Sequence, residues 1–106
     1  YNVPVIELIL NNGVLGMVRQ WQTLFYQQRY SQTTLEKDVD FSKLCEAFGI
    51  KYFEISKKSE IEDKLKEALD SEKPVLINCI IDKNINVLPM VPAGASIYEP
   101  ILEISV

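Results

Sequence analysis

Two asparagines and a glycine stand between a nearly continuous apolar run and a stretch with helical periodicity. The apolar run covers residues 3–10, and Asn11, Asn12 and Gly13 follow it directly. In open parallel sheets, ligands bind beyond the carboxyl ends of the strands, where the next helix begins. Neutral amide oxygens suit a hard cation such as Mg²⁺, above all a cation that also bridges phosphates. Gly13 and Gly16 would let a ligand approach the backbone closely. Asn-Asn-Gly is more often a simple turn, so the residues alone favour a turn, with a cation and phosphate site as the functional alternative.

Met17 and Trp21 lie four residues apart in the helical stretch, so they share one face of the expected helix. That face is either the wall of a small-molecule pocket above the cation site or part of the core. The chain has no histidine, which excludes Ser–His, Cys–His and His–metal chemistry within it. No carboxylate or nucleophile has a convincing partner in the sequence. We therefore expect no catalytic residue in this chain.

Strands and helices alternate along the sequence, which predicts an α/β fold with a parallel sheet flanked by helices in three layers. The most apolar run, Val75–Ile81, should lie centrally in the sheet. The predicted strands cover residues 3–10, 51–55 and 75–81. Two predicted helices cover residues 14–28 and 41–48, and a third follows Ser59 and includes residues 60–69. We expect the first strand to be covered on both faces, and residues 29–39 to form a loop.

Several residues predict where the helices end and which sides face inward. Asp40 is a plausible N-cap and Gly49 a plausible stop for the second helix. Ser59 with Glu62 fits a capping box at the start of the third helix. The inward residues of that helix should be Ile61, Leu65, Ala68 and Leu69.

The two cysteines predict no disulfide framework. Cys45 falls on the apolar face of a helix and Cys79 within an apolar strand, so both should be reduced core residues. Reduced thiols suit a cytoplasmic protein or, in a eukaryote, an organellar matrix.

Composition limits the classes of function. The chain has 106 residues, 47% of them apolar and 25% charged, and a net charge of −4. This balance is typical of a globular domain, and the acidic net charge argues against nucleic acid or an anionic membrane as partner. The opening residues include no initiator Met, so we expect the chain to be part of a longer protein. The segment 83–106 is irregular and apolar, and its prolines exclude a helix interior around residues 87–94.

The string from Ile9 to Tyr26 closely resembles the catalytic subunit of acetohydroxyacid synthase, also called acetolactate synthase. The likeness continues at Arg29-Tyr30-Ser31, Ala47-Phe48-Gly49-Ile50 and Pro74-Val75-Leu76, and the segment Val87–Gly94 matches the characteristic C-terminal segment of that family. The resemblance covers essentially the whole chain.

The resemblance implies thiamine diphosphate and Mg²⁺ as cofactors. Asn12 would then supply a side-chain oxygen and Val14 a backbone carbonyl to Mg²⁺. Gly13, Gly16 and Met17 would lie against thiamine diphosphate, and Met17 and Trp21 would shape the pocket for the second substrate. FAD would bind the full enzyme through other domains.

The implied reaction is the decarboxylation of pyruvate and the addition of its remaining carbons to a second 2-keto acid. The products, 2-acetolactate or 2-aceto-2-hydroxybutyrate, belong to branched-chain amino-acid biosynthesis. The implied partners are the 2-keto acids, further catalytic subunits in a homodimer or tetramer, and a regulatory small subunit.

The chain departs from the family pattern in one respect. The cofactor motif of the family opens with Gly-Asp-Gly, and only its closing Asn-Asn is present here. The catalytic glutamate of the family belongs to another domain. We therefore expect residues 1–82 to be a partial cofactor-binding domain, residues 83–106 to be a tail that caps the active site, and the isolated chain to be inactive.

Two other readings remain open. The chain could be a non-catalytic α/β interaction module, or part of another thiamine-diphosphate enzyme such as a catabolic acetolactate synthase or glyoxylate carboligase. The Met17–Trp21 pair and the Val-Leu-Pro-Met segment favour the biosynthetic acetolactate synthases. By the sheet order of the family, the first strand should also form an edge, which invites pairing with another chain.

Overall fold

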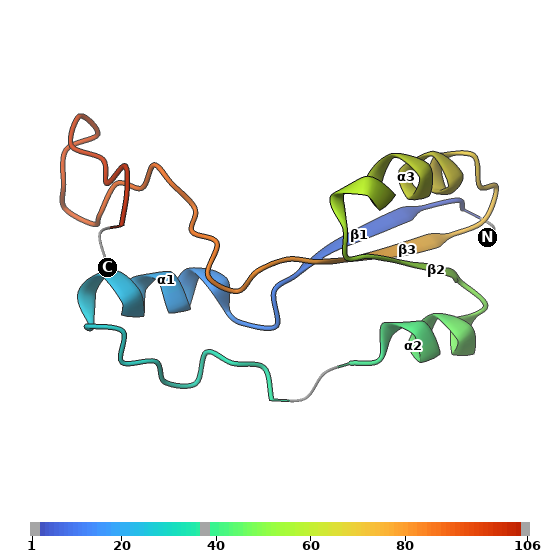
Figure 1. The fold of residues 1–106 in the computed structure, drawn as a ribbon, viewed down its shortest axis with the longest axis horizontal. Coiled ribbons are helices and arrows are strands. Elements are labelled where there is room, and N and C mark those ends of the chain that lie inside the picture. The colour runs from blue at the N-terminus through green and yellow to red at the C-terminus, as the bar shows by residue number, and fades with distance from the viewer. Residues whose placement is uncertain (1–2, 37–38, 105–106) are drawn as a thin grey trace. The chain divides into compact units, whose positions relative to one another are not determined.

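The computed structural model describes residues 3–36 and 39–104, and the chain forms two compact units (Figure 1). The first unit comprises residues 1–13 and 36–82, and the second comprises residues 14–35 and 83–106. These units are groups of residues that contact one another. The predicted boundary instead separates residues 1–82 from residues 83–106 by their role, and it stays a prediction.

A three-stranded parallel sheet forms the centre of the first unit. Its strands are β1 (Ile6–Asn11), β2 (Lys51–Ile55) and β3 (Val75–Ile80), in the order β1-β3-β2. The predicted central position of β3 is confirmed, and the first four residues of β3 are buried. The predicted covering of β1 on both faces is wrong within this chain, because Leu8 is 47% exposed and Leu10 65% exposed.

Two helices cover the two faces of this sheet (Figure 1). Helix α3 (Ile61–Leu69) packs on one face, where Ala68 joins Ile55, Val75 and Ile77 in the buried core. Helix α2 (Phe41–Phe48) lies on the opposite side. The predicted α/β fold with three layers is confirmed.

Helix α2 begins and ends where the sequence predicts. The Asp40 carboxylate accepts hydrogen bonds from the backbone N–H of Lys43 at 3.1 Å and from the Ser42 hydroxyl at 2.6 Å. Gly49 ends the helix in the left-handed conformation, with φ at +66°. Both predicted caps of α2 are therefore confirmed.

The start of α3 differs from the prediction. A 3₁₀ turn, Lys58–Glu60, precedes the helix, and the Glu60 carboxylate accepts the backbone N–H groups of Ser56 and Lys57. The predicted N-cap at Ser59 is wrong, because Ser59 lies within the 3₁₀ turn and Glu60 is the residue that directly precedes α3.

The predicted inward face of α3 is only partly correct. Ala68 is buried and Leu65 packs against the core, but Ile61 is 40% exposed and Leu69 is 73% exposed. Successive helical residues are rotated by about 100°, so Leu69 turns away from the face that holds Ala68. Ile61 stands at the very start of the helix and lines a surface cavity.

Both cysteines are free thiols, as predicted. Cys45 is 1% exposed on α2, and Cys79 is half-buried and packs against the core cluster. Burial, together with the nearby Glu7 carboxylate, raises the pKa of the Cys45 thiol. The Cys45 thiol therefore stays protonated and behaves as an apolar side chain.

The second unit contains one helix, α1 (Gly16–Phe25), and two irregular segments in its described part. The helix is shorter than the predicted span of residues 14–28, because Gln27 and Gln28 adopt left-handed conformations with φ at +53° and +59°. Residues 83–104 contain no helix or extended strand, as predicted. An isolated antiparallel β-bridge joins Met90 to Ile101 within this segment. The predicted loop of residues 29–39 contains one bridging residue, Thr34, and positions 37 and 38 lie outside the described residues.

Candidate functional site

The Asn-Asn-Gly turn follows β1 at the carboxyl edge of the sheet. The Asn11 side-chain oxygen accepts the backbone N–H of Gly13 at 3.1 Å, and the Asn11 carbonyl accepts the N–H of Ile81 at 3.0 Å. Gly13 has φ at +65°, a conformation that disfavours any side chain. Asn11 and Gly13 thus shape the turn, and the predicted Mg²⁺ ligand Asn12 lies half-buried between them.

The donors predicted for Mg²⁺ are two neutral oxygens two residues apart in the sequence. Asn12 lies in the turn that closes residues 1–13 of the first unit, and Val14 opens the second unit, where it forms a bridge with Thr34. Within residues 3–36 and 39–104, no three His, Cys, Asp or Glu side chains gather as a metal site. An amide and a carbonyl fit Mg²⁺ when the ligand brings the negative charge as phosphates.

Gly16, Met17 and Trp21 all belong to α1. Gly16 is its first residue, and Met17 and Trp21 are 46% and 39% exposed. The two side chains line one apolar hollow of about 430 Å³ with Val18, Gln22 and Tyr26. The Phe25 ring packs against Trp21 edge to face, with the ring centroids 5.3 Å apart. In this chain Met17 and Trp21 therefore form a surface wall and not part of a core.

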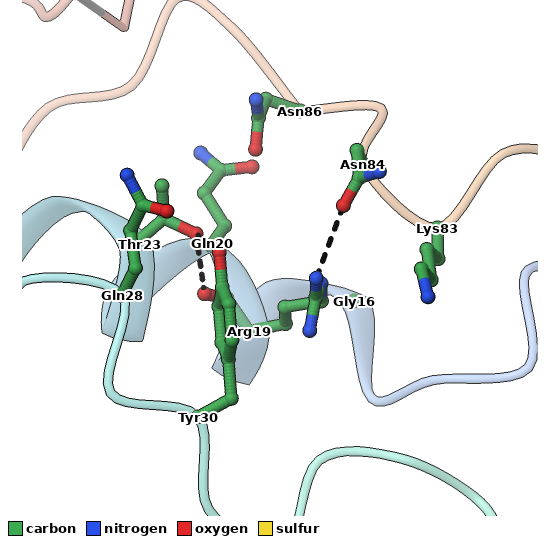
Figure 2. Close-up of a pocket in the computed structure, with 9 residues that line it drawn as sticks. All are labelled: Gly16, Arg19, Gln20, Thr23, Gln28, Tyr30, Lys83, Asn84 and Asn86. Carbon is green, nitrogen blue, oxygen red and sulfur yellow. Dashed lines mark hydrogen bonds between the residues drawn. The ribbon is translucent and has the colours of Figure 1, made fainter. Parts of the chain in front are cut away.

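Two further cavities were not predicted from the sequence. One, of about 240 Å³, lies in the first unit near the carboxyl ends of the strands, beside α3, and includes Leu10, Ile55 and Cys79. The other, of about 230 Å³, lies in the second unit and is polar (Figure 2). Arg19 and Asn84 meet there at 3.1 Å, although they are 65 positions apart.

Among residues 3–36 and 39–104, four ionisable groups have pKa values shifted by capping or burial. Hydrogen bonds from Ser42 and Lys43 lower the pKa of Asp40, and those from Ser56 and Lys57 lower the pKa of Glu60. Burial raises the pKa of Tyr52, as it does that of Cys45. All four groups lie in the first unit and serve helix ends or packing on the sheet.

The parallel sheet and the turn after β1 agree with the class of domain that a family comparison identifies. The chain belongs to the family of the thiamine pyrophosphate enzyme, C-terminal TPP binding domain, whose profile matches residues 1–79. More particularly, it is similar to acetolactate synthases. It is 46% identical over 103 residues to the acetolactate synthase isozyme 2 large subunit of Escherichia coli, and 48% identical over 96 residues to the mitochondrial acetolactate synthase catalytic subunit of Saccharomyces cerevisiae. It is 45% identical over 104 residues to a probable acetolactate synthase large subunit of Methanocaldococcus jannaschii.

These matches cover 97%, 91% and 95% of this chain but only 19%, 14% and 17% of the respective relatives. The chain therefore spans less than a fifth of the length of these curated relatives. The resemblance to acetolactate synthase catalytic subunits is confirmed. In the described part of the chain, no helix is both long and apolar enough to cross a bilayer.

Proposed function

We propose that the complete protein containing this chain is an acetolactate synthase. It would condense two pyruvates, or pyruvate and 2-ketobutyrate, with loss of CO₂, in the biosynthesis of branched-chain amino acids. The observation that carries this proposal is the identity of 45–48% to acetolactate synthases over more than nine tenths of the chain. The relatives named here come from bacterial, mitochondrial and archaeal sources, and reduced cysteines agree with a cytoplasmic or matrix compartment.

In this proposal the chain binds the diphosphate end of the cofactor. Asn12 and Val14 supply neutral oxygens to Mg²⁺, and Gly13 allows the backbone to approach the phosphates. When bound, thiamine diphosphate supplies the chemistry that removes CO₂ from one 2-keto acid and joins its remaining carbons to another. Asn11 keeps the turn in shape through its bond to the Gly13 N–H at 3.1 Å.

Helix α1 would position the cofactor and the second substrate. Gly16 and Met17 would lie against thiamine diphosphate, and Met17 with Trp21 would shape the pocket that accepts pyruvate or 2-ketobutyrate. The exposure of both side chains on an apolar hollow supports this role, because a packed core would leave no room for a ligand.

Other parts of the complete protein would supply what this chain does not contain. FAD would bind through other domains, and a further catalytic subunit of a homodimer or tetramer would complete the active site. By the same resemblance, a regulatory small subunit would be a further partner. We expect the isolated 106-residue chain to release no acetolactate from pyruvate.

The test is acetolactate formation by the complete protein with pyruvate, thiamine diphosphate and Mg²⁺. The Asn12→Ala variant should need about tenfold or more Mg²⁺ for half-maximal activity, because it loses one metal ligand. Asn11→Ala is the matched control, since its side chain holds the turn and should affect stability more than the Mg²⁺ requirement. A cofactor-loaded complete protein that forms no acetolactate would refute the proposal.

A further inference from the structure

The polar cavity of the second unit lies between α1 and two irregular segments of the same unit (Figure 2). Arg19 and Thr23 reach it from α1, Tyr30 from the following loop, and Lys83 and Asn84 from the segment after residue 82. Its volume is about 230 Å³, which is enough for a ligand of a few heavy atoms.

The charged residues that line this cavity are both cations. The nine residues that line it include two cations, Arg19 and Lys83, and no carboxylate. Ion pairs in the described part of the chain join Lys43 to Asp40, and lysines 51 and 64 to glutamates 67 and 60. Neither Arg19 nor Lys83 takes part in any of these pairs. Two cations thus line the same cavity in a chain whose net charge is −4.

The guanidinium of Arg19 is held in place by its neighbours. It stacks over the Tyr30 ring at 3.7 Å from the centroid and donates a hydrogen bond to the Asn84 side-chain oxygen at 3.1 Å. The Tyr30 hydroxyl is in turn hydrogen-bonded to Thr23 at 3.2 Å. A guanidinium fixed in this way loses little conformational freedom when it binds a ligand.

The irregular segment that carries Lys83 and Asn84 is also anchored. The buried Gln20 amide donates to the Val87 carbonyl at 3.0 Å and accepts the Val87 N–H at 2.7 Å. These two hydrogen bonds connect α1 with the segment immediately beyond the cavity, so both walls of the site are held before a ligand arrives.

We propose that this cavity binds a small oxyanion, either a carboxylate or an inorganic phosphate. Arg19 would bind it through the N–H groups not used by Asn84, and Lys83 would add a second positive charge. The cavity volume of about 230 Å³ is large enough to admit acetate or phosphate. Arg19 and Lys83 are not among the residues proposed for thiamine diphosphate, although Gly16 lines this cavity and is also assigned to the cofactor site.

Isothermal titration of the complete, cofactor-saturated protein with acetate and, separately, with inorganic phosphate tests the proposal at constant ionic strength. One of the two anions should bind with a dissociation constant of about a millimolar, and which one binds identifies the ligand class. Arg19→Gln should weaken that binding about tenfold or more. Lys83→Gln, at an exposed position that should not affect folding, should weaken it by a smaller factor.

Arg29→Gln is the matched control. Arg29 lies in the same unit, donates to the Tyr26 carbonyl at 3.1 Å and does not line the cavity, so its loss should leave anion binding unchanged. Equal binding by the wild type, Arg19→Gln and Lys83→Gln would overturn the proposal. Absence of heat from both anions at roughly 10 mM would do the same. Neither result would bear on acetolactate formation.

Discussion

Gln20 is buried on a helix whose large apolar side chains are half exposed. Its amide satisfies both backbone groups of Val87, and its Nε2 atom also lies 3.5 Å from the Met90 sulfur. Gln20→Ala would leave the N–H and C=O of Val87 without these partners. We expect it to weaken the attachment of residues 83–104 to α1 by about 1–3 kcal/mol. Hydrogen exchange at the Val87 amide should become faster.

A second glutamine of α1 provides the matched control. Gln22 donates to the Ser31 carbonyl at 3.1 Å and accepts the Ser31 N–H at 3.0 Å, so it makes the same pair of hydrogen bonds to a different segment. Gln22→Ala should speed exchange at Ser31 and leave Val87 protected. If Gln20→Ala leaves the exchange rate of Val87 unchanged, Gln20 does not anchor this segment.

Trp21 should decide which 2-keto acid the complete protein prefers as second substrate. The Trp21→Leu change removes a large aromatic wall from the hollow that Met17 also lines. We expect the preference for 2-ketobutyrate over pyruvate to change about tenfold. The measurement is the ratio of the two acetohydroxy acids formed from a mixture of both substrates.

Phe25→Leu is the control for Trp21, because Phe25 touches the Trp21 ring but does not line the hollow. It should alter the product ratio far less. An unchanged ratio in Trp21→Leu would defeat the assignment of this side chain to the substrate pocket.

The turn after β1 could be located from the sequence because its signal is local. Three adjacent turn-forming residues end an apolar run, and the structure places them at the carboxyl edge of the sheet. The polar cavity could not be located in this way. Arg19, Tyr30 and Asn84 are distant in the sequence, and no periodicity connects a helix to an irregular segment more than 60 residues later.

At the scale of elements, the bounds of a helix or strand were predicted correctly where cap residues or apolar residues mark its ends and its buried side. Helix α2 and strand β2 have the predicted bounds, since Asp40 and Gly49 mark the helix ends and the strand carries Tyr52, Phe53 and Ile55. Prediction was less accurate for α1, because nothing in the composition of Gln27 and Gln28 signals a left-handed backbone. At the start of α3 the prediction of Ser59 as N-cap was wrong, because a 3₁₀ turn over Lys58–Glu60 precedes the helix and Glu60 is the residue before it.

The N-cap of α2 should make stability depend on acid pH. The folded state lowers the pKa of Asp40 below its unfolded value of about 3.9, since Ser42 and Lys43 bond to its ionised form. The stabilisation is therefore fully present above that unfolded value and is lost as the pH falls toward the folded pKa. Asp40→Ala should lower the free energy of unfolding at pH 7, and its deficit should shrink in acid, as measured by urea unfolding.

Asp40→Asn separates capping from charge. Asparagine is an equally good N-cap, so this variant should keep most of the helix stability at pH 7. It should lose the part of the acid dependence that Asp40 contributes, because its amide does not titrate. If Asp40→Ala and the wild type lose stability in parallel down to the lowest pH, Asp40 does not contribute to the acid dependence.

At the scale of the whole molecule, the order β1-β3-β2 leaves β1 at one side of the sheet. Within the described residues, β1 pairs with β3 and with no other strand. Val5, Leu8 and Leu10 are each between 47% and 65% exposed along this edge. An apolar edge with open backbone groups is a template for pairing with a further strand.

We therefore expect the isolated 106-residue chain to associate at tens of micromolar, as measured by light scattering. Leu10→Lys should shift the population toward monomer, because a charged edge residue opposes strand pairing. Leu69→Lys is the control, since Leu69 is 73% exposed on α3 and lies away from the strand edge, so it should leave association unchanged. A monodisperse wild-type monomer would contradict the prediction. An equal effect of the two lysine variants would show that exposed apolar area in general, rather than the β1 edge, drives association.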